Sequence, residues 1–442
     1  MPSRWPTRKV STEDRFMKQR ILTSVLVAVL GLNLFMGARL YLNSAEAGDR
    51  DDVYRNMETF TRVLEIVRKE YVDGSKVNYE DLVNDALKGM LSRLDPHSEY
   101  MDARRFTAMQ TDTRGEFGGV GIVVSMRNGM LTVVAPMDDT PGAKAGILAG
   151  DRIIKIEGKN TRGWTLQDAV GKLRGKVGTK ANFTVARSVS GEIKEIKVSV
   201  ERAVIQVKTV RDLTGKGDYK LLEENIGYVR LASFGDKSSL ELEAAMRKME
   251  KAGLTGLVLD LRDNPGGLLD QSVRVSEKFL PKGQLVVSTE GRAKKDIDKH
   301  HASGRSEIRK YPVVILVNGG SASASEIVAG CLQDLKRADL VGEKTYGKGS
   351  VQSILPLRNG AALRLTTAKY YTPSHRVIHG KGIMPDHVVK LEASILRDLK
   401  LQRSPDGLKS LPKEDRERVA KAKDTQLEKA LELLKAKLTV SK

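Results

Sequence analysis

The sequence predicts a multidomain α/β protein with an N-terminal helical segment, a small β-rich domain, a strand–helix core and a helical tail. Three changes in pattern along the chain predict this order. Apolar residues recur first at helical spacing, then in short β-branched runs between glycine turns, and then in continuous runs that alternate with amphipathic helices. The 442 residues, 40% of them hydrophobic, suffice for about two or three domains beyond any targeting segment.

The first segment has the features of a targeting signal. Residues 1–20 hold six basic and two acidic side chains, and the apolar run at 21–38 ends at Arg39. Positive charge before an apolar run keeps residues 1–20 inside and exports the rest. The run is marginal for a bilayer span of about 20 residues and long for a signal-peptide core. We expect residues 21–42 to anchor the chain, or to be released by cleavage at the small-x-small site 45–47.

The other boundaries follow the same changes in pattern. Arg127-Asn128-Gly129, between two β-branched runs, is typical of a hairpin turn. Continuous apolar runs at 256–261 and 312–317 are typical of parallel strands that are covered on both faces. The expected parts are a helical region at 50–110, a β-rich domain at 111–203, an α/β core at 204–390 and a helical tail at 391–442.

Charge and cysteine content exclude several classes of function. The net charge is +19, but acidic residues are interleaved with the basic ones, and no basic block carries interspersed aromatics. We therefore expect no nucleic-acid partner, only a general attraction to anionic surfaces such as membranes. Cys331, the single cysteine, excludes an internal disulfide and a multi-cysteine metal site, and its small-residue helical surroundings predict a buried side chain.

A glycine turn at 118–122 leads directly into a strand. Such a turn can aim several backbone N–H groups at one carboxylate, and the strand edge can take a peptide as an added strand. Taken alone, the turn is better explained as a tight strand entry. The residues at 140–147 and 149–158, however, resemble the signature of bacterial PDZ domains. That resemblance implies a loop that binds a peptide C-terminal carboxylate, formed by Gly119, Val120, Gly121 and Ile122.

A candidate nucleophile follows the second apolar run. Strand, glycine turn and helix place Ser323 at a helix N-terminus, where free N–H groups and the helix dipole favour a developing oxyanion. Ser323 and Glu326 also fit a capping box, in which the serine only caps the helix. On this segment alone, the capping interpretation is favoured.

A nucleophilic serine needs a base, and a lysine can serve if burial keeps its amine neutral. The six histidines carry no motif of a Ser–His–Asp or zinc site. Lys348 lies in a glycine bend before an apolar strand, a position that can bury its stem. Gly342 and Gly347-Lys348 have the spacing of a phosphate-binding loop, but Gly349 replaces the magnesium ligand and a strand follows instead of a helix. These two departures argue against nucleotide binding.

Five motifs together point to one family. They are Leu-Asp-Pro-His-Ser-Glu-Tyr at 94–100, Leu-Asp-Leu-Arg-Asp-Asn-Pro-Gly-Gly at 259–267, Ser-Ala-Ser-Ala-Ser-Glu-Ile at 321–327, Gly-Lys-Gly-Ser-Val-Gln at 347–352 and Gly-Ile-Met-Pro-Asp at 382–386. With the PDZ signature, this set resembles the carboxy-terminal processing peptidases, also called tail-specific proteases. The resemblance spans roughly residues 50–390 and implies an α/β protease core of the ClpP/crotonase type.

The resemblance also implies site residues. Ser323 falls on the family's nucleophile, Lys348 on its general base and Gln352 on the glutamine that orients the lysine. The oxyanion donors would be the backbone N–H groups of Ala324 and Gly267. The implied reaction is acyl transfer to the serine followed by hydrolysis, without a metal or cofactor.

The implied partners are protein substrates, bound through their C-termini on the periplasmic side of the inner membrane. The family context leaves room for an adaptor protein. Leucines at 427, 431, 434 and 438 form one helical stripe, which indicates packing onto the body or onto a partner helix in a homo-oligomer. The alternative function is an inactive PDZ-type binding or scaffold protein of the envelope, although the intact Ser323, Lys348 and Gln352 set argues against it.

Overall fold

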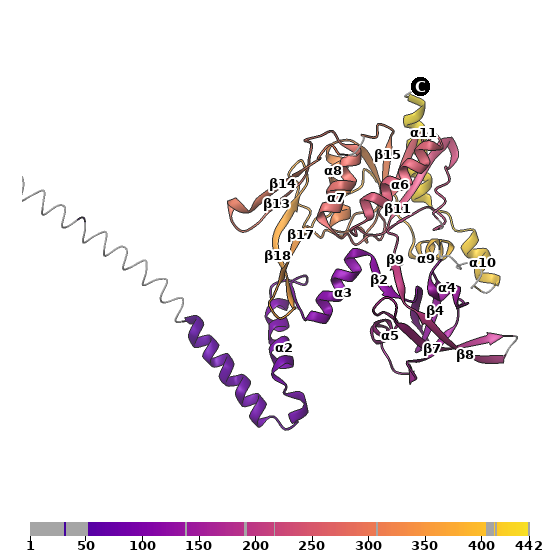
Figure 1. The fold of residues 1–442 in the computed structure, drawn as a ribbon. Coiled ribbons are helices and arrows are strands. Elements are labelled where there is room, and N and C mark those ends of the chain that lie inside the picture. The colour runs from indigo at the N-terminus through magenta and orange to yellow at the C-terminus, as the bar shows by residue number, and fades with distance from the viewer. Residues whose placement is uncertain are drawn as a thin grey trace, which may run out of the picture. The chain divides into compact units, whose positions relative to one another are not determined.

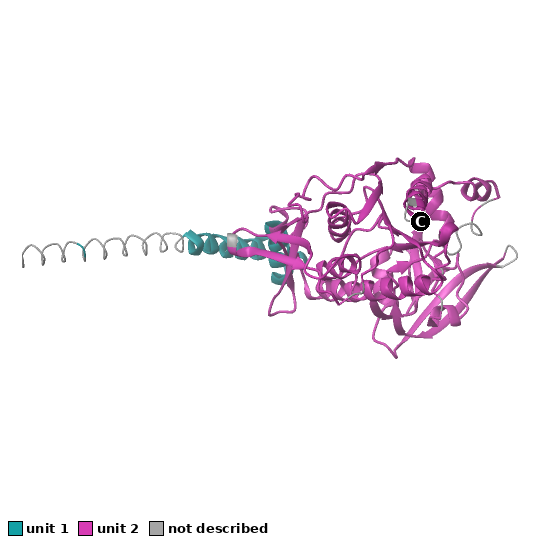
Figure 2. Ribbon diagram, turned by 90° about the horizontal axis from the view of Figure 1, so that it is seen from above, with its two compact units in different colours: residues 1–90 teal, residues 91–442 magenta. Residues whose placement is uncertain are grey.

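The computed structural model describes Gly31 and residues 52–440, except for 138, 190–191, 216, 306–307, 404–410 and 412. The chain divides into two units, residues 1–90 and 91–442, which Figure 2 distinguishes by colour. The predicted anchor at 21–42 lies outside the described residues, apart from Gly31. Within the part of the chain that is described, no helix combines the length and apolar character needed to cross a bilayer.

The described part of the first unit is helical, as predicted. Residues 52–70 form one helix, and a 3-10 turn (Gly74–Lys76) precedes α2 (Tyr79–Ser92). The Asp73 carboxylate caps the turn by accepting from the Ser75 N–H at 3.1 Å.

The β-rich region forms a six-stranded sheet with the order β3-β4-β5-β7-β8 and β6 paired to β5, in which β3 is an edge strand, and β2 and β9 form a separate two-stranded sheet. The predicted hairpin turn is confirmed, because Asn128 and Gly129 both have positive φ angles between β3 and β4. The elements are β2 (Glu116–Gly119), β3 (Ile122–Arg127), β4 (Met130–Pro136), α4 (Pro141–Lys144), β5 (Arg152–Ile156), β6 (Lys159–Asn160), α5 (Leu166–Leu173), β7 (Lys180–Val189), β8 (Glu192–Glu201) and β9 (Ala203–Gln206).

The core is a six-stranded sheet with the order β10-β11-β12-β15-β16-β19, parallel from β11 to β19. Its apolar strands are covered on both faces, as predicted. One face packs against α6, α7 and α8, and the other face packs against α11 (Figure 1). The elements are β10 (Val210–Arg211), β11 (Ile226–Leu231), α6 (Ser238–Lys251), β12 (Gly256–Asp260), α7 (Leu269–Ser276), β15 (Val313–Val317), α8 (Ala324–Asp334), β16 (Ala338–Gly342) and β19 (His387–Val388).

A second sheet borders this core and corrects the prediction for residues 50–110. That region was expected to be helical, but residues 99–101 form a strand because their backbone pairs with β18, more than 250 residues later. α3 then begins after Asp102, whose carboxylate accepts from the Arg105 N–H at 2.8 Å. The elements are β1 (Glu99–Met101), α3 (Ala103–Arg114), β13 (Leu285–Glu290), β14 (Ile297–His301), β17 (Ser350–Pro356) and β18 (Ala362–Tyr371).

The tail forms α9 (Ala393–Gln402), α10 (Lys413–Ala420) and α11 (Thr425–Val440). The predicted leucine stripe packs onto the body. Leu427 and Leu434 are buried against Val258, Val314 and Val341 of the core sheet, and the other two leucines of the stripe are partly buried beside them. The leucine stripe therefore packs against the core sheet and not against a partner helix. The predicted homo-oligomer rested on this stripe, and the stripe no longer supports it.

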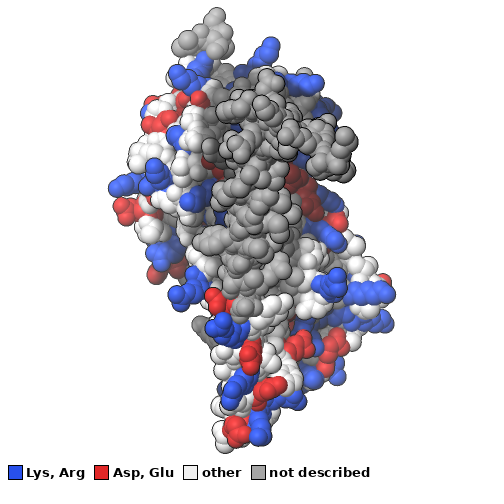
Figure 3. Space-filling view, turned by 90° about the vertical axis from the view of Figure 1, so that its left-hand side faces the viewer, with Lys and Arg blue, Asp and Glu red and all other residues white. Residues whose placement is uncertain are grey.

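Charged side chains of both signs are mixed on the face shown in Figure 3. Among the described residues, several ion pairs are exposed, such as Lys88 with Asp85 at 3.0 Å. Such pairs contribute about 0–1 kcal/mol each to stability. The interleaving of charge seen in the sequence thus persists on this surface.

Candidate active site

Ser323 lies between β15 and α8 in a strained backbone conformation. Its φ and ψ angles are 54° and −114°, and the residue is only 7% exposed. The predicted capping box is only half formed: the Glu326 carboxylate accepts from the Ser323 N–H at 2.9 Å, but the serine side chain makes no cap hydrogen bond. Tyr370 lines a cavity together with Ser323, and burial raises the pKa of Tyr370 to about 12. A non-glycine residue at positive φ is a strain that functional sites retain.

The Glu326 carboxylate connects the serine turn to the lysine bend. It is fully buried and accepts hydrogen bonds from the Ser323 N–H, the Thr345 hydroxyl, the Gly347 N–H at 2.7 Å and the Lys348 N–H at 2.8 Å. Burial raises the pKa of Glu326, against the effect of these four donors. One carboxylate thereby fixes the backbones of both predicted catalytic residues.

Ser323, Lys348 and Gln352 line one cavity of about 670 Å³. Burial lowers the pKa of Lys348; the charge of Arg364 lowers it further, while Asp95 opposes the shift. Across the described residues, no hydrogen bond joins the Lys348 amine to Ser323 or Gln352. The structure therefore brings the predicted set to one cavity without the direct contact of amine and hydroxyl.

Gln352 has other partners in this structure. Its Nε2 donates to the Ser350 hydroxyl at 2.9 Å and to the Thr366 hydroxyl at 3.2 Å. The pairing of β17 with β18 shifts register between Val351 and Gln352. Such an irregularity re-aims a side chain, here one that lines the cavity.

The loop at 264–267 forms another wall of the cavity. Gly266 and Gly267 have φ angles of 98° and 148°. A Cβ on Gly266 would lie 2.8 Å from the Ser323 Cβ, and one on Gly267 would lie 2.2 Å from the Phe234 carbonyl oxygen. Only glycine lets the loop approach the serine this closely. Within the described chain, the Gly267 and Ala324 N–H groups have no hydrogen-bond partner, as oxyanion donors require.

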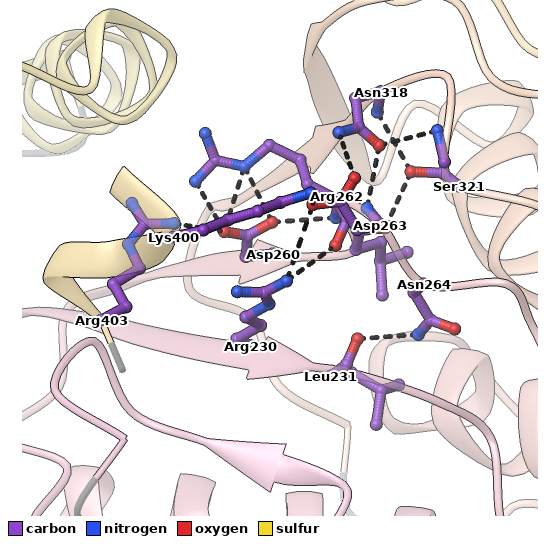
Figure 4. Close-up of polar contacts among 12 residues, drawn as sticks. Arg230, Leu231, Asp260, Arg262, Asp263, Asn264, Asn318, Ser321, Lys400 and Arg403 are labelled. Atoms are coloured by element: carbon purple, nitrogen blue, oxygen red, sulfur yellow. Dashed lines mark hydrogen bonds and ion pairs between the residues drawn. The ribbon is translucent and has the colours of Figure 1, made fainter. Parts of the chain in front are cut away.

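Polar contacts hold this loop against the serine turn (Figure 4). The Asn318 carboxamide oxygen accepts from the Asp263 and Gly320 N–H groups, and the Ser321 hydroxyl donates to the Leu261 carbonyl at 2.7 Å. The Asn264 amide donates to the Leu231 carbonyl at 2.7 Å. Hydrogen bonds thus join the loop that carries the Gly267 N–H to the turn that carries the Ala324 N–H.

A buried charge cluster ties the same loop to the tail. Arg262, 3% exposed, pairs with Asp260 at 2.6 Å and with Asp424, just before α11, at 2.9 Å. Lys400 of α9 pairs with Asp263 at 2.9 Å, and Figure 4 shows α9 beside the cluster. Nearby guanidinium groups, first that of Arg262, hold the pKa of Asp260 well below its usual range, against the effect of its burial.

The predicted carboxylate-binding loop runs from the end of β2, where Gly119 pairs with Ala203 of β9, to the free edge of the β-rich sheet. Ile122 begins edge strand β3, and Val120 packs into the core of that domain. Gly121 has a φ of 74°, and a Cβ there would lie 2.2 Å from the Thr140 side chain. The glycine is thus required by sterics, and the edge is open to an added strand.

Sequence reasoning missed three residues around the candidate pair. Tyr370 of β18 lines the cavity with Ser323. Asp95 and His97 lie within electrostatic reach of Lys348. Their motif was recognised, but its position beside the lysine depends on the pairing of β1 with β18. Cys331 is buried, as predicted, and burial raises its pKa.

A strained serine at a helix N-terminus, facing unpaired backbone N–H groups across a cavity, is the arrangement of a serine hydrolase. The comparisons agree with this class. Residues 225–389 match peptidase family S41, residues 132–187 match the PDZ domain, and residues 37–105 match the N-terminal domain of the activating protease CtpB.

Known relatives span most of the chain. It is 44% identical over 374 residues to the carboxy-terminal-processing protease of Bartonella bacilliformis, covering 84% of this chain and 83% of that protein. It is 34% identical over 367 residues to the carboxy-terminal processing protease CtpA of Bacillus subtilis, covering 83% and 75%. A solved structure, the photosystem II D1 C-terminal processing protease, is 28% identical with a TM-score of 0.42, covering 79% of this chain and 97% of that one. The chain belongs to the carboxy-terminal processing proteases of peptidase family S41.

Proposed function

We propose that this protease cleaves exported proteins near their C-termini, with Ser323 as nucleophile and Lys348 as general base. The observation that carries the proposal is that both side chains line one cavity while their backbone N–H groups share the Glu326 carboxylate. The basic residues 1–20 before the apolar run support an exported location.

The reaction is acyl transfer in two halves. The neutral Lys348 amine takes the Ser323 proton as the oxygen attacks the scissile carbonyl, while the Ala324 and Gly267 N–H groups bind the oxyanion. The Lys348 ammonium then protonates the leaving amine, and water hydrolyses the acyl-enzyme. Because no hydrogen bond joins the Lys348 amine to the Ser323 hydroxyl in the described part of the free enzyme, substrate binding has to bring them together. Catalytic hydrogen bonds often form or shorten only in the substrate complex. In that complex, the Gln352 carboxamide oxygen accepts from the Lys348 amine, while its Nε2 keeps the Ser350 and Thr366 hydroxyls as acceptors.

A covalent label tests the nucleophile. A fluorophosphonate should form a phosphorus–oxygen bond at Ser323 with loss of fluoride, detected by peptide mass spectrometry. Because the pKa of Lys348 lies below its usual value, its neutral form is present at lower pH than in free lysine, and labelling should accelerate as pH rises through that pKa. Ser321 and Ser325, whose hydroxyls donate to backbone carbonyls, are the internal controls. An enzyme that binds peptide but takes no label at Ser323 is the inactive scaffold.

The PDZ domain is proposed to capture the substrate C-terminus at Gly119–Ile122. Two substrates that differ only in a C-terminal carboxylate or amide test this, and the carboxylate form should have the lower KM. Gly121→Ala should raise the KM of the carboxylate form by about tenfold, the value of one or two charge-assisted hydrogen bonds, and leave the amide form unchanged. Gly158→Ala is the matched control, since Gly158 has a similar φ of 76° in open space. Equal KM values for the two substrates would contradict the assignment.

A further inference from the structure

The turn at 95–98 is joined through Thr366 to Gln352, which lines one cavity with Lys348, and the turn is closed by its own carboxylate. Asp95 accepts hydrogen bonds from the His97 N–H at 2.7 Å, the Ser98 N–H at 2.8 Å and the Ser98 hydroxyl at 2.8 Å. β1 follows at once and pairs with β18, which carries Thr366 to Gln352 and Tyr370 to the cavity. The turn is thus fixed from within and by its sheet.

A continuous hydrogen-bond path leads from this turn to Gln352. The Ser98 hydroxyl, in a residue only 5% exposed, accepts from the Thr366 N–H at 3.1 Å and lies 3.5 Å from the Thr366 hydroxyl. That hydroxyl accepts from Gln352 Nε2 at 3.2 Å. Since Ser98 is itself bonded to Asp95, the position of the glutamine amide depends on the turn.

The turn also places charges around the lysine. Asp95 brings a negative charge that favours the ammonium form. The positive charge of Arg364 disfavours it, and this guanidinium is held by the His97 carbonyl at 3.1 Å and by Glu99 at 3.0 Å. Burial and the charge of Lys348 lower the pKa of His97. The other titratable groups beside the lysine or its cavity are Asp270, His300, Glu326, Tyr370 and His379.

We propose that Asp95 and Ser98 are positioning residues of the catalytic site: Ser98 holds the Gln352 amide through Thr366, and Asp95 sets the charge balance at the Lys348 amine. The inference rests on the proposed roles of Ser323 and Lys348. It gives the turn a part in proton transfer, although neither side chain lines the cavity.

Asp95→Asn tests the charge. The asparagine retains an acceptor for the two N–H groups but removes the negative charge, so the neutral amine becomes easier to form. The rising limb of kcat against pH should move to lower pH. A loss of folded enzyme that is constant with pH scales kcat without moving this midpoint, and circular dichroism over the same pH range checks that the folded fraction is constant. Asp102→Asn, which changes a helix-capping carboxylate near the same turn, should leave the midpoint in place.

Ser98→Ala tests the hydrogen-bond path. We expect kcat to fall by about tenfold, the usual value of one hydrogen bond to a positioned group, with KM and the pH midpoint unchanged. Ser98→Thr, which keeps the hydroxyl, should restore kcat. Ser353→Ala is the matched control. It removes a 2.7 Å contact with Thr367 between β17 and β18, the strands that carry Gln352 and Thr366, but this contact is not part of the hydrogen-bond path from Ser98 to Gln352.

The outcomes separate the two proposals. If Ser323→Ala or Lys348→Met retains full activity, the proposed mechanism itself fails. If those variants are inactive while Asp95→Asn keeps the wild-type midpoint or moves it to higher pH, the role of Asp95 is wrong. If Ser98→Ala keeps wild-type kcat, the role of Ser98 is wrong.

Discussion

Lys348→Met is expected to lower kcat by about 10³-fold or more, the scale on which a lost general base acts. Methionine keeps the length and apolar character of the lysine stem, so the cavity wall is preserved. It also removes a charge that burial already disfavours, and the free energy of unfolding should not decrease. The measurement is steady-state cleavage of an unfolded protein, with urea denaturation of the same preparations.

The control for this variant is Lys344→Met in the same loop. Lys344 is exposed, four residues before the candidate base, so its removal changes net charge equally without touching the cavity. Wild-type kcat is expected for this control. A Lys348→Met enzyme that kept more than a tenth of wild-type kcat would remove the lysine from the mechanism.

Glu326→Gln is expected to lower both stability and activity. The amide offers one acceptor oxygen where the carboxylate offers two, so one pair of buried donors faces an NH₂ group. Leaving one or two donors unpaired costs about 2–4 kcal/mol of unfolding free energy. Because the same carboxylate aligns Ser323 with Lys348, kcat should fall by about 100-fold, as small displacements of catalytic groups do.

Glu241→Ala separates these two effects; alanine is needed because one oxygen of Glu241 accepts all three of its hydrogen bonds, so glutamine would keep them. The Glu241 carboxylate also accepts several hydrogen bonds, from the Thr209 N–H and hydroxyl and from the Val210 N–H, but it lies outside the cavity. This variant should lose stability and keep kcat. If Glu326→Gln also lost stability and kept kcat, the Glu326 carboxylate would stabilise the fold without aligning the catalytic residues.

Elements that depend on residues close together in the sequence were predicted correctly. The strands at 256–261 and 312–317 and the hairpin turn at 127–129 follow from apolar runs and turn residues, and all three are present. Ser323 could be placed at a helix N-terminus because strand, glycine turn and helix succeed one another in the sequence. Ser323 and Lys348 line one cavity, which is consistent with the predicted pairing of a nucleophile with a lysine base.

The features that could not be predicted from the sequence depend on contacts between residues far apart in the chain. β1 has three residues and no strand pattern of its own, so only β18 makes it a strand. The nearness of Asp95 to Lys348 and of Tyr370 to Ser323 follows from that sheet and from no spacing along the chain. The leucine stripe predicted burial correctly, but its partner could be identified only from the sheet face that it covers.

The position of α11 has a consequence for biosynthesis. A ribosome that has translated residue 389 has already made every side chain that lines the candidate cavity. One face of the central sheet then still lacks its cover, and Arg262 still lacks Asp424. Proteolytic competence should therefore arise late, after α11 has left the ribosome and docked. A nascent protease would in this way be kept from cutting neighbouring chains before it is finished.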